Sequence, residues 1–140
     1  MSNKKDDKNN IKNKDVNEFK NPTFFNAFKN ALRGCTLAVK NERNIKIQLV
    51  AAVLVTIMGF LFRISFVEWA ILVLTIFFVI VTECLNTAVE KTVDMITQKY
   101  DECAKNVKDI AAGAVLFSAL ASVIVGIIIF LPKILLYWCM

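Results

Sequence analysis

The sequence contains no histidine, so it lacks the side chain that most often serves as a general base or a zinc ligand. Glycine is scarce, and the four scattered glycines cannot form a Walker-type phosphate loop or the glycine-rich loop of a protein kinase. The four cysteines show no metal-ligand spacing, and we interpret them as small apolar residues rather than as disulfide-forming or metal-binding residues. Carboxylate, amide and lysine side chains are therefore the candidates for chemistry.

Charged residues are absent from three long stretches of the chain. These uncharged runs are Ile47–Phe62, Trp69–Thr82 and Ile110–Leu131. The last run has about the 20 residues that a helix needs to cross the hydrocarbon core of a bilayer. The two shorter runs also suit buried helices of a soluble protein, but too little polar sequence remains to cover three such helices. We therefore predict an integral membrane protein.

The two shorter runs reach spanning length when the adjoining residues Glu42–Gln48 and Glu83–Val89 are counted as helix. The sequence then predicts an all-α membrane protein in which one N-terminal surface helix precedes three transmembrane helices. The predicted membrane domain covers residues 23–140, and its spans lie at about residues 44–63, 69–91 and 109–132.

A net charge of +5 could suggest a nucleic-acid partner, but the positions of the basic residues argue against it. Eleven of the 17 precede the first run, the first connection holds only Arg63, and the second connection holds four lysines. Basic residues that flank membrane spans stay in the cytoplasm, which places the N-terminus and the second connection inside and the C-terminus outside. We expect a multi-pass protein of the cytoplasmic membrane, with no nucleic-acid partner.

The N-terminal part of the chain divides into two segments of different composition. Residues 1–22 contain little apolar sequence, so we expect a disordered polar cytoplasmic tail and no cleavable signal peptide. From Phe24 to Lys40 the pattern is that of an amphipathic helix, which we expect to lie on the bilayer surface. A soluble helix packed on a partner would show the same pattern. The apolar and basic faces are formed, respectively, by Phe24, Phe28, Ala31, Cys35 and Ala38 and by Lys29, Arg33 and Lys40.

The segment after the second run carries the most informative polar residues. At about 100° per residue, one side of a helix would carry Glu83, Asn86, Glu90 and Asp94. Ionisable groups at membrane depth are costly and usually face a partner or a cavity. Solvated charges at a helix end would explain Asp94, but they would not explain Glu83 directly after an uncharged run. Glu83 is therefore predicted to be functional.

Two further polar clusters are expected at the same membrane surface. Glu42 precedes the first span, and Lys108 and Asp109 precede the third. Several carboxylates can bind Mg²⁺, a lysine can neutralise phosphate oxygens, and a carboxylate set apart from the metal can accept a proton. These are the parts that phosphoryl transfer requires. Spacing alone leaves open an oligomeric ion channel or transporter that uses Glu83.

Residues 83–94 (ECLNTAVEKTVD) resemble the signature E-x-x-N-[ST]-A-[IV]-E-x-x-V-D of the prokaryotic diacylglycerol kinase and undecaprenol kinase family. The resemblance covers about residues 24–132 and implies a small homotrimeric lipid kinase in the cytoplasmic (inner) membrane of a bacterium. ATP would be the phosphoryl donor and Mg²⁺ the cofactor. Supporting matches are Asn41-Glu42 before the first span, Trp69 at the start of the second, and Lys108–Leu116 at the opening of the third.

The same resemblance implies a role for individual residues. Glu83 matches the general base that accepts the proton of the lipid hydroxyl, and Asn86 matches the amide beside it. Glu42 and Glu90 match the carboxylates that hold the metal. The implied nucleotide-binding residues are Glu42, Glu90, Tyr100, Asp101, Lys108 and Asp109. The implied lipid-binding residues are Ala27, Gly34 and Glu83.

Two departures from the family pattern concern histidine. Many relatives carry Arg-Ile-His where this chain has Lys46-Ile47-Gln48, and a histidine is usual at or near Asp101. The departures leave the base and the metal ligands unchanged and affect the expected contacts to adenine and ribose. The Asn-Thr-Ala pattern and the start of the third span resemble the Gram-positive branch, so we expect undecaprenol as the lipid alcohol, giving undecaprenyl phosphate. Diacylglycerol, giving phosphatidic acid, is the alternative.

Overall fold

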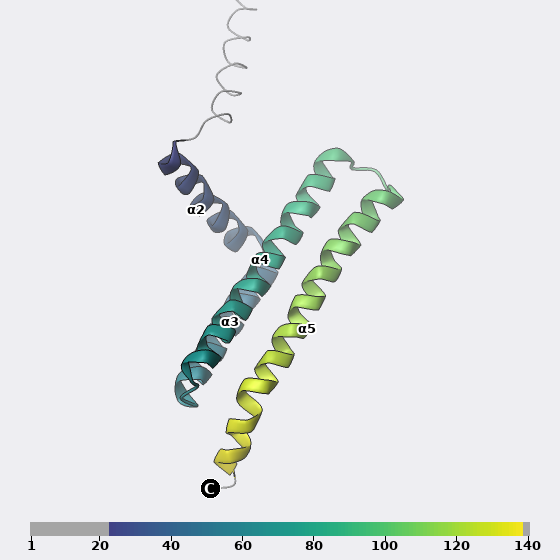
Figure 1. Cartoon of the computed structure of the whole chain (residues 1–140). Coiled ribbons are helices and arrows are strands. Elements are labelled where there is room, and N and C mark those ends of the chain that lie inside the picture. The colour runs from purple at the N-terminus through teal and green to yellow at the C-terminus, as the bar shows by residue number, and fades with distance from the viewer. Residues whose placement is uncertain (1–22, 139–140) are drawn as a thin grey trace, which may run out of the picture. The chain divides into compact units, whose positions relative to one another are not determined.

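The computed structural model describes residues 23–138, and the predicted tail at residues 1–22 lies outside this range. Within the described range the chain forms helices and no strands, which confirms the predicted all-α class. The helices are α2 (Phe24–Asn41), α3 (Arg43–Leu61), α4 (Phe66–Ile96) and α5 (Glu102–Trp138) (Figure 1).

The described part of the chain divides into two compact units, with the boundary between Leu37 and Ala38. The first unit contains most of α2, and this confirms the helix predicted after residue 23. Phe24, Phe28 and Leu32 are exposed on α2. Ala27 and Gly34 also lie on this helix, and a Cβ atom added at Gly34 would meet nothing within 4 Å. The location of α2 on a bilayer surface stays a prediction.

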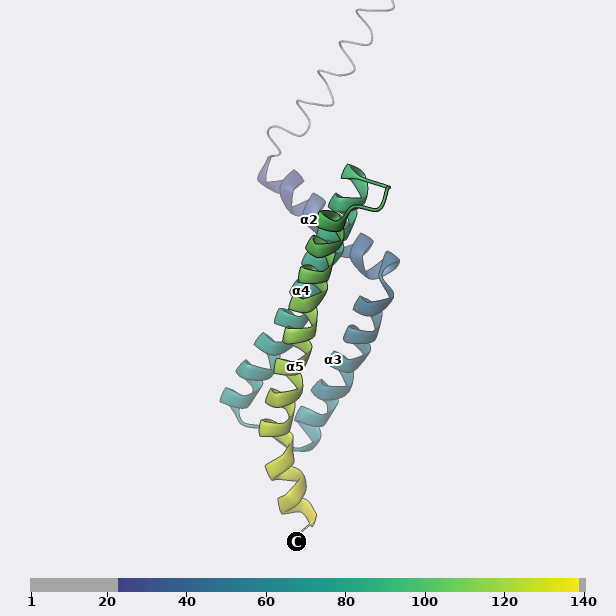
Figure 2. The ribbon, with the colours of Figure 1, turned by 90° about the vertical axis from the view of Figure 1, so that its right-hand side faces the viewer.

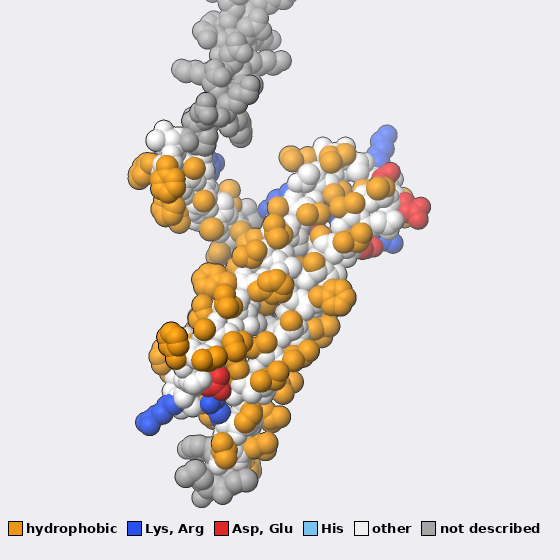
Figure 3. Space-filling view, in the orientation of Figure 1, with side chains coloured by type: hydrophobic (Ala, Val, Ile, Leu, Met, Phe, Trp, Pro, Cys, Tyr) orange, Lys and Arg blue, Asp and Glu red, His pale blue; other side chains and the backbone are white. Residues whose placement is uncertain are grey.

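The three helices of the second unit are long and apolar enough to cross a membrane, which agrees with the three predicted spans. Each apolar stretch is continuous with polar residues that extend the same helix. Thus α4 begins at Phe66 and α5 at Glu102, ahead of the predicted spans, and only residues 97–101 separate the two helices. Side chains along the flank of the helices are mainly apolar, whereas charged side chains gather near the two ends (Figure 3).

Helix α4 packs closely against α5, and α3 packs on α4 (Figures 1 and 2). Most of the apolar surface of the chain stays exposed, as expected for helices that face lipid rather than water. The buried apolar cluster lies where the connection between α3 and α4 meets α5, and it contains Ile64, Leu72, Ile129 and Phe130.

The connection between α3 and α4 is shorter than the positions of charged residues in the sequence predict, because α4 begins at Phe66. Charge alone favours a loop position for Glu68, but this residue lies in the first turn of α4. The backbone N–H of Ser65 donates to Glu68 Oε2 at 2.6 Å, and the Glu68 N–H donates to Ser65 Oγ at 3.4 Å. This capping box satisfies two N–H groups that would otherwise lack partners, so the helix begins earlier. Lys133 of α5 then forms an ion pair with Glu68 at 3.1 Å.

Candidate active site

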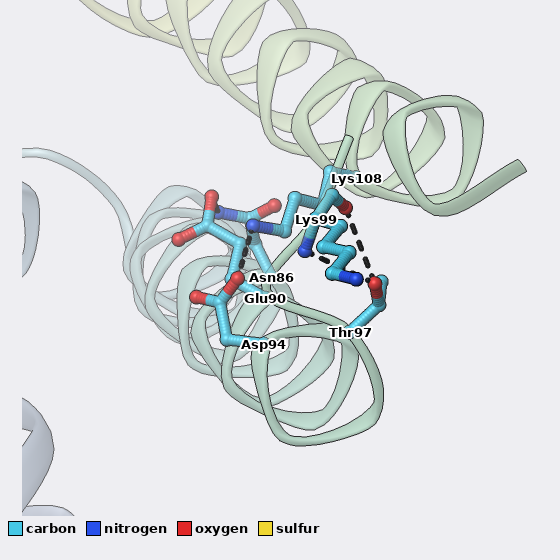
Figure 4. A network of polar contacts seen from close by, with 6 residues as sticks. All are labelled: Asn86, Glu90, Asp94, Thr97, Lys99 and Lys108. Carbon is cyan, nitrogen blue, oxygen red and sulfur yellow. Dashed lines mark hydrogen bonds and ion pairs between the residues drawn. The ribbon is translucent and has the colours of Figure 1, made fainter. Parts of the chain in front are cut away.

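The polar stripe predicted on α4 runs toward the end of the unit where residues 97–101 connect α4 to α5, which we call the α4–α5 end. Burial decreases along the stripe toward this end: Glu83 is 3% exposed and Asn86 9% exposed, Glu90 is partly buried, and Asp94 is exposed. The stripe therefore runs from the interior of the helical unit to its polar end. Figure 4 shows its outer members together with the neighbouring residues of the connection and of α5.

Glu83 has its side-chain partner on α3. Gln48 Nε2 donates a hydrogen bond to Glu83 Oε2 at 3.2 Å, across a sequence separation of 35 residues. Gln48 lies on the same face of α3 as Ile45, which is 1% exposed, so the helix face that packs inward also carries the amide. None of the ion pairs formed by the described residues involves Glu83. Glu83 is thus a buried carboxylate next to a neutral donor.

Asn86 and Glu90 contact each other one helical turn apart. Asn86 Nδ2 donates to Glu90 Oε1 at 3.0 Å, which is the contact that an i, i+4 spacing allows (Figure 4). Asn86 Oδ1 is buried and has no hydrogen-bond partner among the described residues. Asn86 therefore orients Glu90 directly, while Glu83 is oriented from another helix.

Glu42 lies at the N-cap position of α3, and its side chain does not cap the helix. Instead, Glu42 Oε1 accepts a hydrogen bond from Lys91 Nζ of α4 at 2.9 Å, forming an ion pair across 49 residues. The Lys91 side chain is 58% exposed, so water screens this pair and the contact is readily exchanged. The start of α3 is thereby placed beside the polar half of α4.

Lys108 of α5 forms an ion pair with Asp94 of α4 at 2.5 Å (Figure 4). This ion pair holds Lys108 toward α4 through a carboxylate that other charged groups can replace.

Asp101 has a structural role that the sequence did not reveal. Its Oδ1 accepts a hydrogen bond from the backbone N–H of Ala104 at 2.8 Å, at the start of α5.

Four of the residues expected to bind nucleotide line one groove at the α4–α5 end. The groove has a volume of about 350 Å³ and lies between the end of α4, the connection and the start of α5. Tyr100 is 85% exposed there, and Asp109 is also exposed. Glu42 and Glu90 do not line this groove. The four lining residues are Tyr100, Asp101, Lys108 and Asp109.

The carboxylates fit a metal that is shared with a substrate. Mg²⁺ takes oxygen ligands and often uses one or two carboxylates together with substrate phosphates. Glu42 and Glu90 offer such oxygens near the polar end of α3 and α4. Among residues 23–138, there is no group of three or more Asp, Glu, Cys or His side chains that could hold a metal ion. The residues therefore suit a metal held jointly with phosphate oxygens, and they do not suit a cation bound by the protein alone.

Sequence patterns missed three of the contacts at this site: the Gln48 partner of Glu83, the Lys91 partner of Glu42, and the Asp94 partner of Lys108. Of these three residues, Gln48 was the easiest to identify from the sequence, because it is a polar residue near the start of an uncharged run. The i, i+3 step places it on the same face of the first span as Ile45, and the structure shows that this face packs inward.

Comparisons with known proteins agree with the motif on α4. Residues 29–130 match the family described as prokaryotic diacylglycerol kinase. An undecaprenol kinase of Bacillus subtilis is 47% identical over 110 residues, which cover 79% of this chain and 89% of that protein. A diacylglycerol kinase of Synechocystis is 40% identical over 115 residues, covering 81% of this chain and 66% of that protein. The chain therefore belongs to the prokaryotic diacylglycerol kinase family, a family of membrane lipid kinases.

Proposed function

We propose that this lipid kinase transfers the γ-phosphoryl group of MgATP to the hydroxyl group of undecaprenol, producing undecaprenyl phosphate. The observation that carries the proposal is Glu83, a carboxylate that is 3% exposed at the point where the apolar half of α4 gives way to its polar stripe. A lipid alcohol presents its hydroxyl at this depth, where a water-soluble acceptor would not reach. A carboxylate there can accept the hydroxyl proton as a general base.

The other residues supply positioning and charge. Asn86 orients Glu90, and Glu42 offers a second carboxylate from α3. Glu42 and Glu90 would hold Mg²⁺, and the bound metal would reduce the negative charge on the phosphate oxygens of the nucleotide. Lys108 would exchange Asp94 for phosphate oxygens, and this exchange is feasible because the pair lies at the solvated end of the helices.

An apolar cavity supports a long-chain lipid as the acceptor. The cavity has a volume of about 240 Å³, begins beside Gln48 and extends between α3, α4 and α5 as far as Phe130. Its wall includes Ala51, Ala52 and Gly126, whose small side chains leave room along the helices. An isoprenoid or acyl chain in this cavity would bring the attached hydroxyl near the Glu83 end.

Undecaprenol is preferred over diacylglycerol because the undecaprenol kinase of Bacillus subtilis is the more similar relative and is covered over 89% of its length. The Synechocystis diacylglycerol kinase is 40% identical, which keeps diacylglycerol as the alternative acceptor. We further propose that the enzyme is a homotrimer in the bacterial cytoplasmic membrane, with the N-terminus and the α4–α5 end in the cytoplasm. The basic residues that flank this end support that orientation.

The test is phosphorylation by the purified full chain in mixed micelles. Labelled MgATP is offered with undecaprenol, with diacylglycerol or without lipid, beside the Glu83→Gln variant. Label in undecaprenol that is lost in the variant supports the proposal. Label in diacylglycerol alone would show that diacylglycerol, and not undecaprenol, is the acceptor. If a folded protein labels neither lipid, the proposed reaction is wrong and a channel or transporter function of Glu83 becomes the better hypothesis.

A further inference from the structure

Gln48 combines two features that the phosphoryl transfer described above does not explain. It provides the hydrogen bond that Glu83 accepts from α3, and its own carbonyl oxygen, Oε1, is buried with no hydrogen-bond partner among residues 23–138. A buried acceptor without a partner is unfavourable by an amount comparable to a lost hydrogen bond, so folded proteins rarely retain one without a use. The amide is therefore held beside Glu83 at some cost in stability.

We propose that Gln48 is a positioning residue for Glu83 that serves the carboxylate both before and after it takes up a proton. This inference rests on the proposed function, in which Glu83 is the general base. It assigns a role to a residue on α3 that does not itself contact the reacting atoms.

The orientation of the amide follows from chemistry. An ionised carboxylate only accepts hydrogen bonds, so the Gln48 atom that faces Glu83 Oε2 must be the donor Nε2. With Oε2 engaged, the other oxygen of Glu83 is left to receive a proton. Gln48 carries no charge, so it fixes the carboxylate without the competing attraction that a lysine would exert on the anion.

The reaction changes the protonation state of Glu83. In the transfer step the O–H bond of the lipid alcohol breaks and its proton goes to Glu83. The alcohol oxygen forms a bond to the γ-phosphorus, and ADP leaves with the electron pair of the broken P–O bond. Glu83 is then a carboxylic acid, and its new O–H is a donor.

An amide can satisfy both forms of its partner. The proton goes to the oxygen of Glu83 that Gln48 does not contact, so Oε2 remains an acceptor and keeps the hydrogen bond from Nε2 in the acid form as well. A methionine or leucine at position 48 could serve neither form.

The experiment compares kcat and the KM for MgATP of the full chain in mixed micelles, using the lipid that the wild-type protein phosphorylates. Gln48→Met keeps the unbranched shape of the side chain and removes both hydrogen-bonding atoms. We expect kcat to fall by about 10- to 100-fold, which is the value of a hydrogen bond to a charged group. The KM for MgATP should change by less than about twofold. The variant removes the unpaired Oε1 but also leaves Glu83 Oε2 without its donor, so kcat is measured on the folded fraction.

Two further variants separate positioning from packing. Gln48→His restores a donor at this position and should recover most of the lost kcat. Thr56→Val removes a hydroxyl group that bonds only within α3, to the carbonyl of Ala52, and serves as the control that keeps wild-type kcat. Glu83→Gln combined with Gln48→Met should be no slower than Glu83→Gln alone, because a residue that acts through Glu83 has nothing left to position.

Several outcomes would overturn the inference. These are wild-type kcat in Gln48→Met, an equal loss in Gln48→His, a rise in the KM for MgATP that accounts for the whole effect, or losses that multiply in the double variant. If wild-type protein phosphorylates no lipid, the proposed function fails, and the role of Gln48 fails with it. If wild-type and Glu83→Gln behave as proposed but Gln48→Met is fully active, only the present inference fails.

Discussion

Gly59 of α3 lies directly against the indole ring of Trp69 of α4. A Cβ atom added at position 59 would stand 2.8 Å from Trp69 Cη2 and 2.9 Å from Cζ2, and 3.2 Å from Ile64 Cδ1. The ring of Phe60 is tilted against the same indole, at a centroid distance of 4.8 Å. The α3–α4 turn therefore depends on the absence of a side chain at one position.

Replacing this glycine should destabilise the protein without affecting the chemistry. Gly59→Ala forces the ring of Trp69 to move, and overpacking of this kind costs about 1–3 kcal/mol. We expect a lower thermal midpoint in detergent and an unchanged kcat for the folded fraction. Gly59→Ala combined with Trp69→Leu should recover much of the midpoint, and an additive effect of the two changes would show that the contact is not responsible.

Glu83→Gln should abolish nearly all lipid phosphorylation. A general base contributes roughly 10²- to 10⁴-fold to a rate, and glutamine keeps the size of the side chain while losing the proton acceptor. MgATP binding, measured by equilibrium titration, should stay close to wild type. Glu68→Gln is the matched control, since it alters a carboxylate at the other end of α4. Equal loss of kcat in both variants would contradict the assignment.

Glu90→Gln should act on metal and nucleotide binding more than on proton transfer. The variant keeps a hydrogen-bonding partner for Asn86 but removes the negative charge that attracts Mg²⁺. The Mg²⁺ concentration for half-maximal activity should rise by about tenfold, and excess Mg²⁺ should restore part of the rate. A loss of rate that no concentration of Mg²⁺ relieves would argue against a metal role.

Lys108→Met should weaken the binding of MgATP. It removes the cation that Asp94 now contacts and that we expect to meet phosphate oxygens. The KM for MgATP should increase by at least about tenfold, whereas the apparent affinity for the lipid should not change. Lys29→Met, which alters an exposed lysine on α2, is the control. An unchanged KM in Lys108→Met would exclude this lysine from the nucleotide site.

The proposed orientation predicts which loop residues are accessible from each side of the membrane. Single cysteines at Arg63 and Gln98 would be introduced into a chain whose own cysteines are replaced by serine. A thiol reagent that does not cross membranes should label Arg63→Cys in intact spheroplasts, and it should label Gln98→Cys only after permeabilisation. The reverse pattern would invert the topology and place the Glu83 end outside the cell.

The helices and the polar stripe on α4 could be predicted because both depend on local sequence. Long uncharged runs predict spanning helices, and the 3.6-residue period alone places Glu83, Asn86 and Glu90 on one side of a helix. The limits of the helices were less predictable. Charge alone favours a loop position for Glu68, whereas its capping box with Ser65 includes it in α4.

The partners of the site residues could not be predicted in this way. Gln48 and Glu83 are 35 residues apart, and Lys91 and Glu42 are 49 residues apart. Which side chains meet depends on the rotation of α3 and α5 about their own axes relative to α4. No local pattern contains this rotation, because it results from the packing of apolar faces along the whole helices.

The sequence by itself determined that the chain crosses a membrane with three helices and carries carboxylates at one end of the second span, since hydrophobicity and helical period are properties of neighbouring residues. Only the tertiary structure decided that the buried Glu83 accepts its hydrogen bond from the neutral Gln48 and that Lys108 meets Asp94. The physical reason is that each contact of Glu83 and Lys108 joins separate helices, whose relative positions are fixed by side-chain packing rather than by local propensity.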